Sequence, residues 1–363
     1  MKVLHYVEHW LELSAGFVHG QISRSLYGSV VVSHNTTENL DAFPIRPLVR
    51  LDRLVAHVPP RRWPAVRSGT LRTVAAAYRT EAVHVHFGYA VRDVLPLVAR
   101  GRRPLILSLH GDDALALPRR QPGQYDPILD VVAAVIVPSQ FLATATEQLG
   151  FPGDRIHVIP SGVDTRFFTP TPLPEAPVVA FVGRLVEKKG LDVLLAAWPR
   201  VKERRPDAQL RILGTGPLAA LIPSDDPSIR HVQPDPHHRA AQVRDLLRTA
   251  RVVTTPSRTA DGGDAESLLL VNLEAQASGR PVVTTDNGGI PEFVAADESA
   301  LVVPERDPRA LGAALESVLT DDAVAQRLGA AGPAVARRFD VADCASRVDA
   351  VYATVLGHAN RKS

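Results

Sequence analysis

The sequence predicts an α/β protein made of two domains, each a parallel sheet covered by helices. The chain has 363 residues, more than one core usually serves, so two domains of about 150 to 200 residues are expected. Short apolar runs alternate with helix-like segments in both halves, and this alternation implies parallel strands joined by crossover helices. Residues 169–177 hold four prolines and predict a stiff linker between the halves.

Residues 1–168 form the predicted N-terminal domain. Its expected strands are 3–7, 29–33, 82–86, 105–109 and 132–137. Its expected helices are 17–26, 63–79, 91–100 and a helix that starts after Pro138-Ser139 and ends at Gly150. Ser139 is the predicted N-cap of that last helix, because serine is favoured at this position.

Residues 178–339 form the predicted C-terminal domain. Its expected strands are 178–182, 210–213, 252–255, 281–284 and 300–303, and its expected helices are 191–202, 243–250, 266–278, 308–319 and 322–339. Residues 340–363 contain a last helix, 342–357, that can cross back to the N-terminal domain. Open α/β sheets bind ligands at the carboxyl ends of their strands, so the cleft between the domains is the expected site.

Glu266 and Glu274 are the main candidate ligand-binding carboxylates. Eight positions are a little more than two helical turns, so both would project from nearly one face of the expected helix. First-turn amides have no intrahelical partner and carry partial positive charge. Together they suit a group that is anionic at one end and hydroxylated at the other, as in a nucleotide sugar. The alternative is a helix with two solvated glutamates. The apolar residues that bury this helix include Leu268, Leu269 and Leu270.

A glycine-containing loop with two cations precedes the expected helix 191–202. Gly183 lets the backbone come close to a ligand, and Arg184 with Lys189 suits a diphosphate. The alternative is a charged loop without a ligand. Gly214 begins a second tight turn, Gly214-Thr215-Gly216, which by itself indicates only a loop.

His110 stands at the end of an expected strand, in the sequence His110-Gly111-Asp112, where it could face the cleft. A buried structural histidine is the alternative. His84 and His86 share one face of their strand, so a metal held by His84, His86 and His110 is conceivable. No cysteine partner and no His-Glu-x-x-His spacing supports it, and no metal is expected.

Composition and cysteine use favour a cytoplasmic protein. The chain is 45% hydrophobic and 22% charged, ordinary values for a globular protein. Cys344 is the single cysteine, so no disulfide can form within the chain, which fits a reducing compartment. No apolar run of about 18 residues occurs, so the sequence predicts no membrane span.

An arginine-rich segment points to an anionic partner. Residues 41–103 contain twelve arginines, no lysine and four acidic residues. This charge suits a phosphorylated acceptor or peripheral contact with the anionic inner face of a membrane. The alternative is a solvated surface. Aromatic residues are only 5% of the chain and do not interleave with the arginines, so nucleic acid is not an expected partner.

Several stretches resemble the retaining glycosyltransferases of the GT-B fold, family 4, over nearly the whole chain. They are ELSAGFVHGQI, VHVHFG, LSLHGDD, VIPSGVDTRFFTP, FVGRLVEKKGLDVLLAA, LGTGP and the pair Glu266 and Glu274. TADGGDAES and GRPVVTTDNGGIPE look closest to the bacterial exopolysaccharide, colanic-acid-like subgroup. The resemblance implies two Rossmann-like β/α/β domains facing a central cleft, an N-terminal acceptor domain and a C-terminal nucleotide-sugar donor domain.

The resemblance also implies residue roles. Arg184 and Lys189 would bind the donor diphosphate and neutralise the leaving group without a metal or other cofactor. Glu266 would hold hydroxyls of the donor sugar, and Glu274 those of the ribose. His110 would contact the sugar near the reaction centre. The remaining implied donor-site positions are Gly16, Gly183, Gly214, Ser267 and the amides of Leu268, Leu269 and Leu270.

The function implied by the resemblance is transfer, with retention, of a hexosyl or N-acetylhexosaminyl group. The donor would be a nucleotide sugar, UDP-linked in the first instance, and the acceptor a hydroxyl of a sugar or lipid-linked intermediate in polysaccharide or glycoconjugate synthesis. Front-face attack would need no dedicated base. Ser267 and Leu269 depart from the family pattern, in which glycine follows the first glutamate and proline or glycine often stands two places later. Gly16 stands alone where a double glycine is usual, and residues 231–235 replace an apolar-Gly loop. Three alternatives therefore stay open: transfer to a small natural product, nucleotide-sugar binding without transfer, and epimerisation of the sugar nucleotide.

Overall fold

The structure is a computed structural model, and it describes residues 1–11, 16–33, 37, 39–51, 58–98 and 103–360. Contacts divide the chain into two compact units, which are described separately. Unit 1 comprises Met1–Ser161 and Ala342–Ser363, and unit 2 comprises Gly162–Val341. The arginine-rich segment falls partly outside the described residues, at 52–57 and 99–102.

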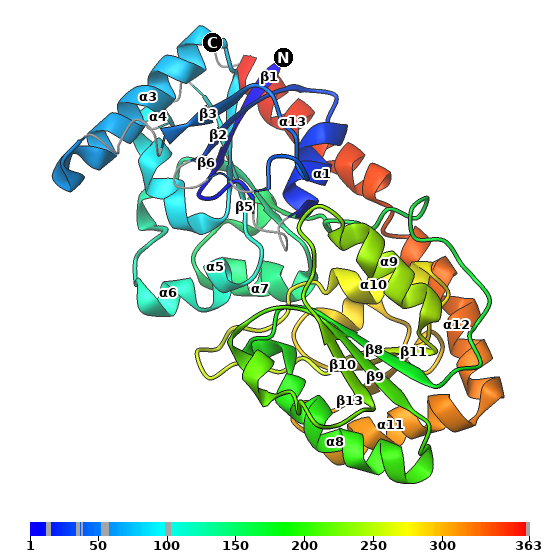
Figure 1. The fold of residues 1–363 in the computed structure, drawn as a ribbon. Coiled ribbons are helices and arrows are strands. Elements are labelled where there is room, and N and C mark those ends of the chain that lie inside the picture. The colour runs from blue at the N-terminus through cyan, green and yellow to red at the C-terminus, as the bar shows by residue number, and fades with distance from the viewer. Residues whose placement is uncertain (12–15, 34–36, 38, 52–57, 99–102, 361–363) are drawn as a thin grey trace. The chain divides into compact units, whose positions relative to one another are not determined.

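Unit 1 contains a seven-stranded sheet in the order β3-β2-β1-β4-β5-β6-β7, and every pairing in it is parallel. Figure 1 shows these strands side by side. β4 and β6 have the predicted bounds, and two short strands, β3 and β7, were not predicted. The strands are β1 (Lys2–Val7), β2 (Gly28–Ser33), β3 (Leu48–Arg50), β4 (Ala82–His86), β5 (Leu105–Ser108), β6 (Val132–Val137) and β7 (Ile156–Val158).

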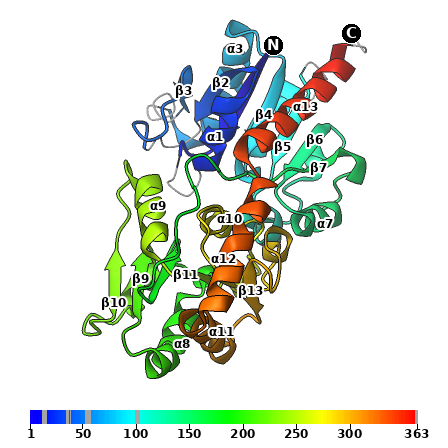
Figure 2. The same cartoon turned by 90° about the vertical axis from the view of Figure 1, so that its right-hand side faces the viewer.

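Helices cover both faces of this sheet. The helices of unit 1 are α1 (Gly16–Arg24), α3 (Trp63–Ala77), α4 (Leu95–Val98), α5 (Asp112–Leu115), α6 (Leu117–Arg120), α7 (Gln140–Gln148) and α13 (Val341–Asn360). α13 lies on one face, where Val348 and Tyr352 pack with Val3 and Ile106 of the strands (Figure 2). Leu4 and Leu107 point to the opposite face and its core, as the two-residue strand period requires.

Two local predictions in unit 1 have different outcomes. The Ser139 side chain accepts a hydrogen bond from the Leu142 N–H, which confirms the predicted N-cap of α7. The helix expected over 91–100 is wrong as a single element. A 3-10 helix at Gly88–Val94 leads into the short α4, and Asp93 near their junction accepts a hydrogen bond from the Tyr6 hydroxyl.

Unit 2 contains a six-stranded parallel sheet in the order β10-β9-β8-β11-β12-β13. The strands β8, β11 and β13 have the predicted bounds, and the edge strand β10 was not predicted. The strands are β8 (Val178–Val182), β9 (Gln209–Leu213), β10 (Ile229–Val232), β11 (Val252–Thr255), β12 (Val282–Thr285) and β13 (Ala300–Val303).

Residues that alternate along the strands of unit 2 pack against helices on the two faces of the sheet. The helices are α8 (Leu191–Arg204), α9 (Arg239–Thr249), α10 (Leu270–Ala277), α11 (Pro308–Thr320) and α12 (Asp322–Arg337). Val179 and Phe181 of β8 pack with α8 and α11, which lie together at the lower edge of Figure 1. Ala180 and Val182 pack with α9 and α10 on the other face.

The proline-rich segment 169–177 lies within unit 2. Arg280 is fully buried and donates hydrogen bonds to the carbonyl groups of Thr171 (2.7 Å) and Pro172 (3.0 Å). These bonds hold the segment against the end of α10. Across the described part of the chain, no helix combines the length and apolar character needed to cross a bilayer.

Candidate functional site

The site in unit 2 lies where the strand order reverses. β8 and β11 are neighbours, but the chain leaves β8 toward β9 on one side and leaves β11 toward β12 on the other. In open α/β sheets such a switch point opens a crevice at the carboxyl ends of the strands. The loops that follow β8, β11 and β12 all start from this edge. Gly190 permits two of them to touch, because a Cβ there would lie 1.8 Å from the Pro256 carbonyl oxygen.

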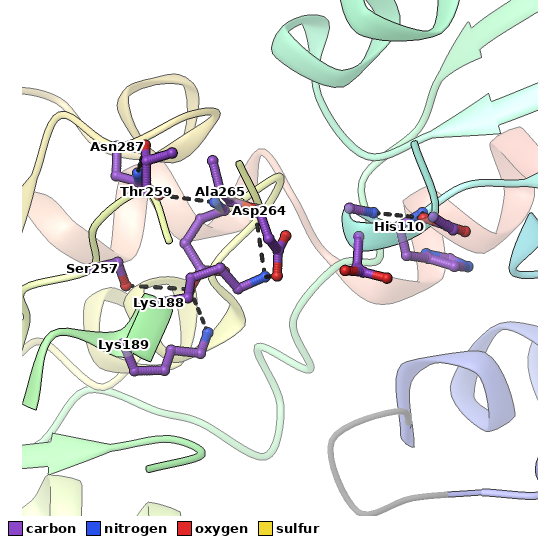
Figure 3. Close-up of polar contacts among 12 residues, drawn as sticks. His110, Lys188, Lys189, Ser257, Thr259, Asp264, Ala265 and Asn287 are labelled. Atoms are coloured by element: carbon purple, nitrogen blue, oxygen red, sulfur yellow. Dashed lines mark hydrogen bonds and ion pairs between the residues drawn. The ribbon is translucent and has the colours of Figure 1, made fainter. Parts of the chain in front are cut away.

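An ion pair joins the loops after β8 and β11. Lys189 Nζ donates to Glu266 Oε1 at 2.6 Å, and the Ser257 hydroxyl donates to the same oxygen at 3.2 Å. Figure 3 shows Lys189 and Ser257 converging in this way. No hydrogen bond from the described residues reaches Glu266 Oε2, so this oxygen can accept a ligand hydroxyl. The structure thus brings together two of the residues that the sequence nominated separately.

Glu266 does not begin a helix, and that prediction was wrong. α10 starts at Leu270, and Glu266 lies in the loop before it. Its main-chain groups are used elsewhere: its N–H donates to Asn287 Oδ1 at 2.8 Å, and its carbonyl accepts from the Gly289 N–H at 2.7 Å. This pattern replaces helical hydrogen bonds with contacts to the loop after β12. Glu266 and Glu274 therefore do not share one helical face.

A second ion pair, which the sequence did not indicate, flanks the first. Lys188 Nζ lies 2.8 Å from Asp264 Oδ2 and 3.5 Å from the Ala265 carbonyl oxygen. Figure 3 shows Lys188 pointing toward Asp264. The Lys188 carbonyl accepts from the Arg258 N–H at 2.8 Å. The adjacent lysines Lys188 and Lys189 thus bind residues 264 and 266 of one loop. The only sequence signal for this second ion pair is that Lys188 and Asp264 stand close to Lys189 and Glu266 in the chain.

The charges of these groups are strongly coupled. Burial alone would raise the pKa of Glu266, but Lys189 and Lys188 outweigh it and lower that pKa. Burial would lower the pKa of Lys188, but Glu266 and Asp264 raise it. For Lys189, burial lowers the pKa, and the cations of Lys188 and Arg184 act in the same direction. Three cations thus face two carboxylates, and an added anion would relieve the repulsion among them.

Arg184 is exposed and forms no hydrogen bond or ion pair with the described residues, so its guanidinium can bind a ligand. Gly183 lies beside the lysine: a Cβ there would be 3.8 Å from the Lys189 side chain. Gly214 is needed for close packing, since a Cβ there would lie 2.0 Å from the Gly183 carbonyl oxygen. Gly214 thus lets the loop after β9 approach the loop after β8.

The residues between Glu266 and α10 present main-chain donors. Ser267 and Leu269 are buried, Leu268 is half-buried, and Leu269 is the N-cap residue of α10. Among the described residues, the N–H groups of Leu268 and Leu269 meet no acceptor. Leu270 is the first helical residue. These amides, which precede the helix, can therefore bind an anion.

Glu274 lies within α10, on its second turn, and is half-buried. Burial raises the pKa of its carboxyl group, and the charge of Arg239 opposes that effect. No hydrogen bond to this carboxylate occurs among the described residues. Glu274 is therefore a carboxylate with open acceptor positions.

In unit 1, His110 follows β5 and packs between two aromatic rings. Its ring centroid is 4.9 Å from that of Phe17 and 4.5 Å from that of Phe87. Burial lowers the pKa of His110 to about 3, so its imidazole is neutral near pH 7. It can therefore exchange hydrogen bonds with a hydroxyl but does not supply positive charge. Gly16, the first residue of α1, lies against the Phe43 ring, since a Cβ at this position would be 2.8 Å from that ring.

Asp113 holds the His110 loop and was missed by the sequence analysis. Its Oδ1 accepts from the N–H groups of His110 (2.8 Å) and Gly111 (2.9 Å), and its Oδ2 accepts from the Gly88 N–H (3.1 Å). Figure 3 shows His110 in this loop. One buried carboxylate thus joins the chain that follows β4 to the chain that follows β5.

A histidine cluster lies beneath α13. The side chains of His5, His84 and His86 are buried, and ligand atoms of the three lie within 4.8 Å of one another. The rings of His84 and His86 stack with centroids 4.1 Å apart and planes 28° apart, and His5 Nδ1 lies at hydrogen-bond distance, 3.0 Å, from His86 Nε2. The two nitrogens of His84 bond the hydroxyl groups of Tyr352 and Ser108. The three histidines that lie together are thus His5, His84 and His86, and His110 is not one of them.

Comparison with solved structures shows the fold. The structure of the Anabaena protein Alr3699/HepE in complex with UDP-glucose matches with a TM-score of 0.77 and 19% identity, over 98% of this chain and all of the other. A sucrose-phosphate synthase from Thermosynechococcus elongatus matches with a TM-score of 0.75 and 19% identity, over 99% of this chain and all of the other. The two parallel-sheet units are thus those of the GT-B fold, as predicted.

Sequence comparison shows the family. The chain is 35% identical to the putative colanic acid biosynthesis glycosyltransferase WcaL of Escherichia coli (strain K12), over 69% of this chain and 64% of that protein. It is 33% identical to a GDP-mannose-dependent alpha-(1-6)-phosphatidylinositol monomannoside mannosyltransferase of Mycolicibacterium smegmatis, over 68% of this chain and 70% of that protein. A D-inositol 3-phosphate glycosyltransferase of Corynebacterium efficiens is 35% identical over 55% of this chain and only 51% of its own length. Residues 24–167 match the family described as Glycosyltransferase Family 4, and residues 176–321 match Glycosyl transferases group 1. The chain belongs to the family 4, group 1 glycosyltransferases.

Proposed function

We propose that the protein transfers a hexosyl or N-acetylhexosaminyl group from a nucleotide sugar to an acceptor hydroxyl, with retention of anomeric configuration. The pairing of Lys189 with Glu266 at the switch point of unit 2 carries this proposal. It sets a cation for a phosphate oxygen beside a carboxylate for a sugar hydroxyl. Those are the two kinds of group that meet at the reacting carbon of a nucleotide sugar.

The proposed donor contacts divide among three kinds of group. Lys189 and Arg184 bind the diphosphate and stabilise the negative charge that develops as it leaves, so the proposed mechanism uses no metal or other cofactor. Glu266 Oε2 accepts a hydrogen bond from the donor sugar, and Glu274 accepts from the ribose. The amides of Leu268 and Leu269 donate to a phosphate oxygen.

The proposed reaction breaks the bond between the anomeric carbon and the diphosphate oxygen. The acceptor oxygen forms its new bond to that carbon on the same face, and its proton passes to the departing phosphate oxygen. No side chain has to act as the base in this scheme. The neutral imidazole of His110 suits a hydrogen bond to a sugar hydroxyl, and its low pKa keeps a positive charge away from the developing oxocarbenium ion.

The first donor to test is a UDP-linked hexose. The solved GT-B neighbours include complexes with UDP or UDP-glucose, whereas the sequence relatives include GDP-mannose-dependent mannosyltransferases. The proposed acceptor is a sugar or a lipid-linked sugar in polysaccharide or glycoconjugate synthesis, at the cytoplasmic face of the membrane. Vesicles with anionic lipid should sediment the protein at low salt and release it at high salt if the arginines of residues 41–103 bind this surface.

A donor panel tests the proposal against its alternatives. The purified protein is incubated with UDP-glucose, UDP-galactose, UDP-N-acetylglucosamine and GDP-mannose, with and without sugar and lipid-linked acceptors, and products are followed by NMR. Transfer with a retained α or β configuration supports the proposal. Transfer to a small natural product, and not to a sugar or lipid-linked sugar, would identify the acceptor as a natural product. Conversion of the donor without acceptor indicates an epimerase, and donor binding without turnover indicates a binding protein.

A further inference from the structure

The side chain of Asn287 connects the loop after β12 to the main chain of Glu266. Asn287 is fully buried, and its Oδ1 accepts a hydrogen bond from the Glu266 N–H at 2.8 Å. Its Nδ2 donates to Glu305 Oε1 at 2.7 Å and to Thr259 Oγ1 at 3.1 Å. Figure 3 shows Asn287 and Thr259 side by side. Both ends of the amide are thus used.

Glu305 fixes which way this amide points. The N–H of Thr259 donates to Glu305 Oε2 at 2.6 Å, and its hydroxyl donates to Glu305 Oε1 at 3.2 Å. An ionised carboxylate can only accept, so it requires the NH2 end of Asn287 to face it. The oxygen of Asn287 must then face Glu266.

The loop after β12 also holds the other main-chain group of Glu266. The Gly289 N–H donates to the Glu266 carbonyl at 2.7 Å. Gly288 has φ of +54°, and a Cβ there would lie 2.1 Å from that carbonyl oxygen, so only glycine permits this approach. Residues 287–289 therefore fix where the Glu266 side chain begins. From that point its carboxylate reaches Lys189 and Ser257.

We propose that Asn287 is a positioning residue for Glu266, and that Glu305 locks Asn287 in the direction needed for that role. The inference rests on the proposed function, in which Glu266 binds the donor sugar. It assigns a task to two residues outside the diphosphate and sugar contacts. Misplacing Glu266 by a fraction of an ångström should lower kcat more than it raises KM for the donor, because the sugar is then held poorly in the transition state.

A reversal of the hydrogen bond between residues 287 and 305 tests the proposal. Asn287→Asp places a second carboxylate 2.7 Å from that of Glu305, where both cannot stay ionised without repulsion. In Glu305→Gln alone, the NH2 group of the glutamine must face either the NH2 group of Asn287 or the N–H of Thr259. Both of these are donors, so one hydrogen bond is lost. In the double variant N287D/E305Q, the Gln donates to the Asp, and the Asp still accepts from the Glu266 N–H.

We expect each single variant to lose about tenfold in kcat, the change equivalent to one lost hydrogen bond. The double variant should recover to within about threefold of the wild type. The N287D variant should also gain activity as the pH falls toward 5, because one of its two carboxyl groups then takes a proton and becomes a donor. A role confined to folding predicts neither the rescue nor this pH profile.

Hydrogen exchange supplies a readout that needs no activity. The amide of Glu266 should be protected in the wild type, exchange faster in N287D, and regain protection in N287D/E305Q. The matched control is Asn272→Asp. Asn272 is also buried, but it bonds the hydroxyls of Thr255 and Thr284, so E305Q should not rescue it. If N287D proves too unstable to purify, E305Q is compared with the wild type instead, in kcat and in exchange of the Glu266 amide. Glu305 is only half-buried, so this variant should fold.

Two results would overturn the inference: wild-type kcat and Glu266 protection in N287D, or a double variant no better than N287D. Failure of the proposed function has a different signature. In that case the wild type neither binds nor turns over any nucleotide sugar, while the exchange of the Glu266 amide still reports whether Asn287 positions it.

Discussion

Lys189 Nζ and Glu266 Oε1 lie 2.6 Å apart although 77 positions of sequence separate the two residues. The lysine follows β8 and the glutamate follows β11, which are adjacent strands at the switch point of the unit 2 sheet. The topology thus makes a local pair from distant segments. The pair leaves Glu266 Oε2 and two Lys189 protons without partners among the described residues, and we expect a donor to occupy them.

Lys189→Ala should lower kcat for sugar transfer by about 100-fold or more. The lysine is held in place by Glu266, and loss of one preorganised donor to a developing negative charge costs about that factor. Steady-state assays with the best donor of the panel measure the change. Lys202→Ala, at the C-terminal end of α8, is the control and should stay within about twofold of the wild type. Equal rates in K189A and K202A would contradict the assigned role.

Glu266→Gln should destabilise the protein near neutral pH but much less in acid. The folded state lowers the pKa of Glu266 from 4.5, so its carboxylate adds stability above that value and loses the contribution as pH falls through the folded pKa. Urea unfolding at pH 7 and below pH 4 measures the free energy of unfolding of both proteins. The difference should be larger at pH 7. Glu203→Gln, at an exposed position, should show no such dependence.

Glu274→Ala should raise the donor KM by about tenfold and leave kcat within about twofold. A contact to ribose is distant from the bond that breaks, so it contributes equally to the bound ground state and the transition state. A donor that lacks the ribose hydroxyls supplies the matched comparison. This donor should bind the wild type and E274A with the same affinity. A tenfold difference between its two affinities would mean that Glu274 does not act through the ribose hydroxyls.

Asp113→Asn should remove a pH dependence of stability in the acidic range. Burial raises the pKa of Asp113 to about 6 from 3.8, so the folded state holds the proton more tightly than the unfolded state. The stability that the Asp113 carboxyl contributes therefore falls as the pH rises from about 4 to 6. The folding equilibrium constant changes by at most about tenfold per pH unit.

The check is the difference in unfolding free energy between the wild type and D113N, measured across pH 3 to 8. Asp154→Asn, an exposed change in the same unit, is the control. D113N should also weaken the binding of acceptor or donor through His110, since an amide oxygen cannot hold the three N–H groups that Asp113 holds. If the difference in unfolding free energy between the wild type and D113N stays constant from pH 3 to 8, the folded state does not raise the pKa of Asp113.

The strands that were predicted lie within one residue of their observed bounds. β8 and β11, which were predicted to the residue, are buried along their whole length, as expected for parallel strands covered on both faces. β10, with Arg230 and His231 in four residues, is an edge strand with no fully buried position and gave no such signal. Burial, more than strand propensity, decided which strands the sequence revealed.

The candidate site was predicted in its residue types but not in its geometry. Arg184, Lys189 and Glu266 were nominated from sequence, yet Glu266 was placed on a helix. The apolar run after it favours a helix locally, whereas Asn287 and Gly289 capture its main chain from a neighbouring strand end. That competition is decided by a contact 21 positions away, which no helical periodicity encodes.

Calorimetric titration of UDP and GDP into the wild type and K189A measures whether unit 2 binds a nucleoside diphosphate through Lys189. We expect saturable one-to-one binding of at least one nucleotide to the wild type, weakened about tenfold or more in K189A and unchanged in K202A. Absence of binding by both nucleotides, or equal affinity of wild type and K189A, would contradict it.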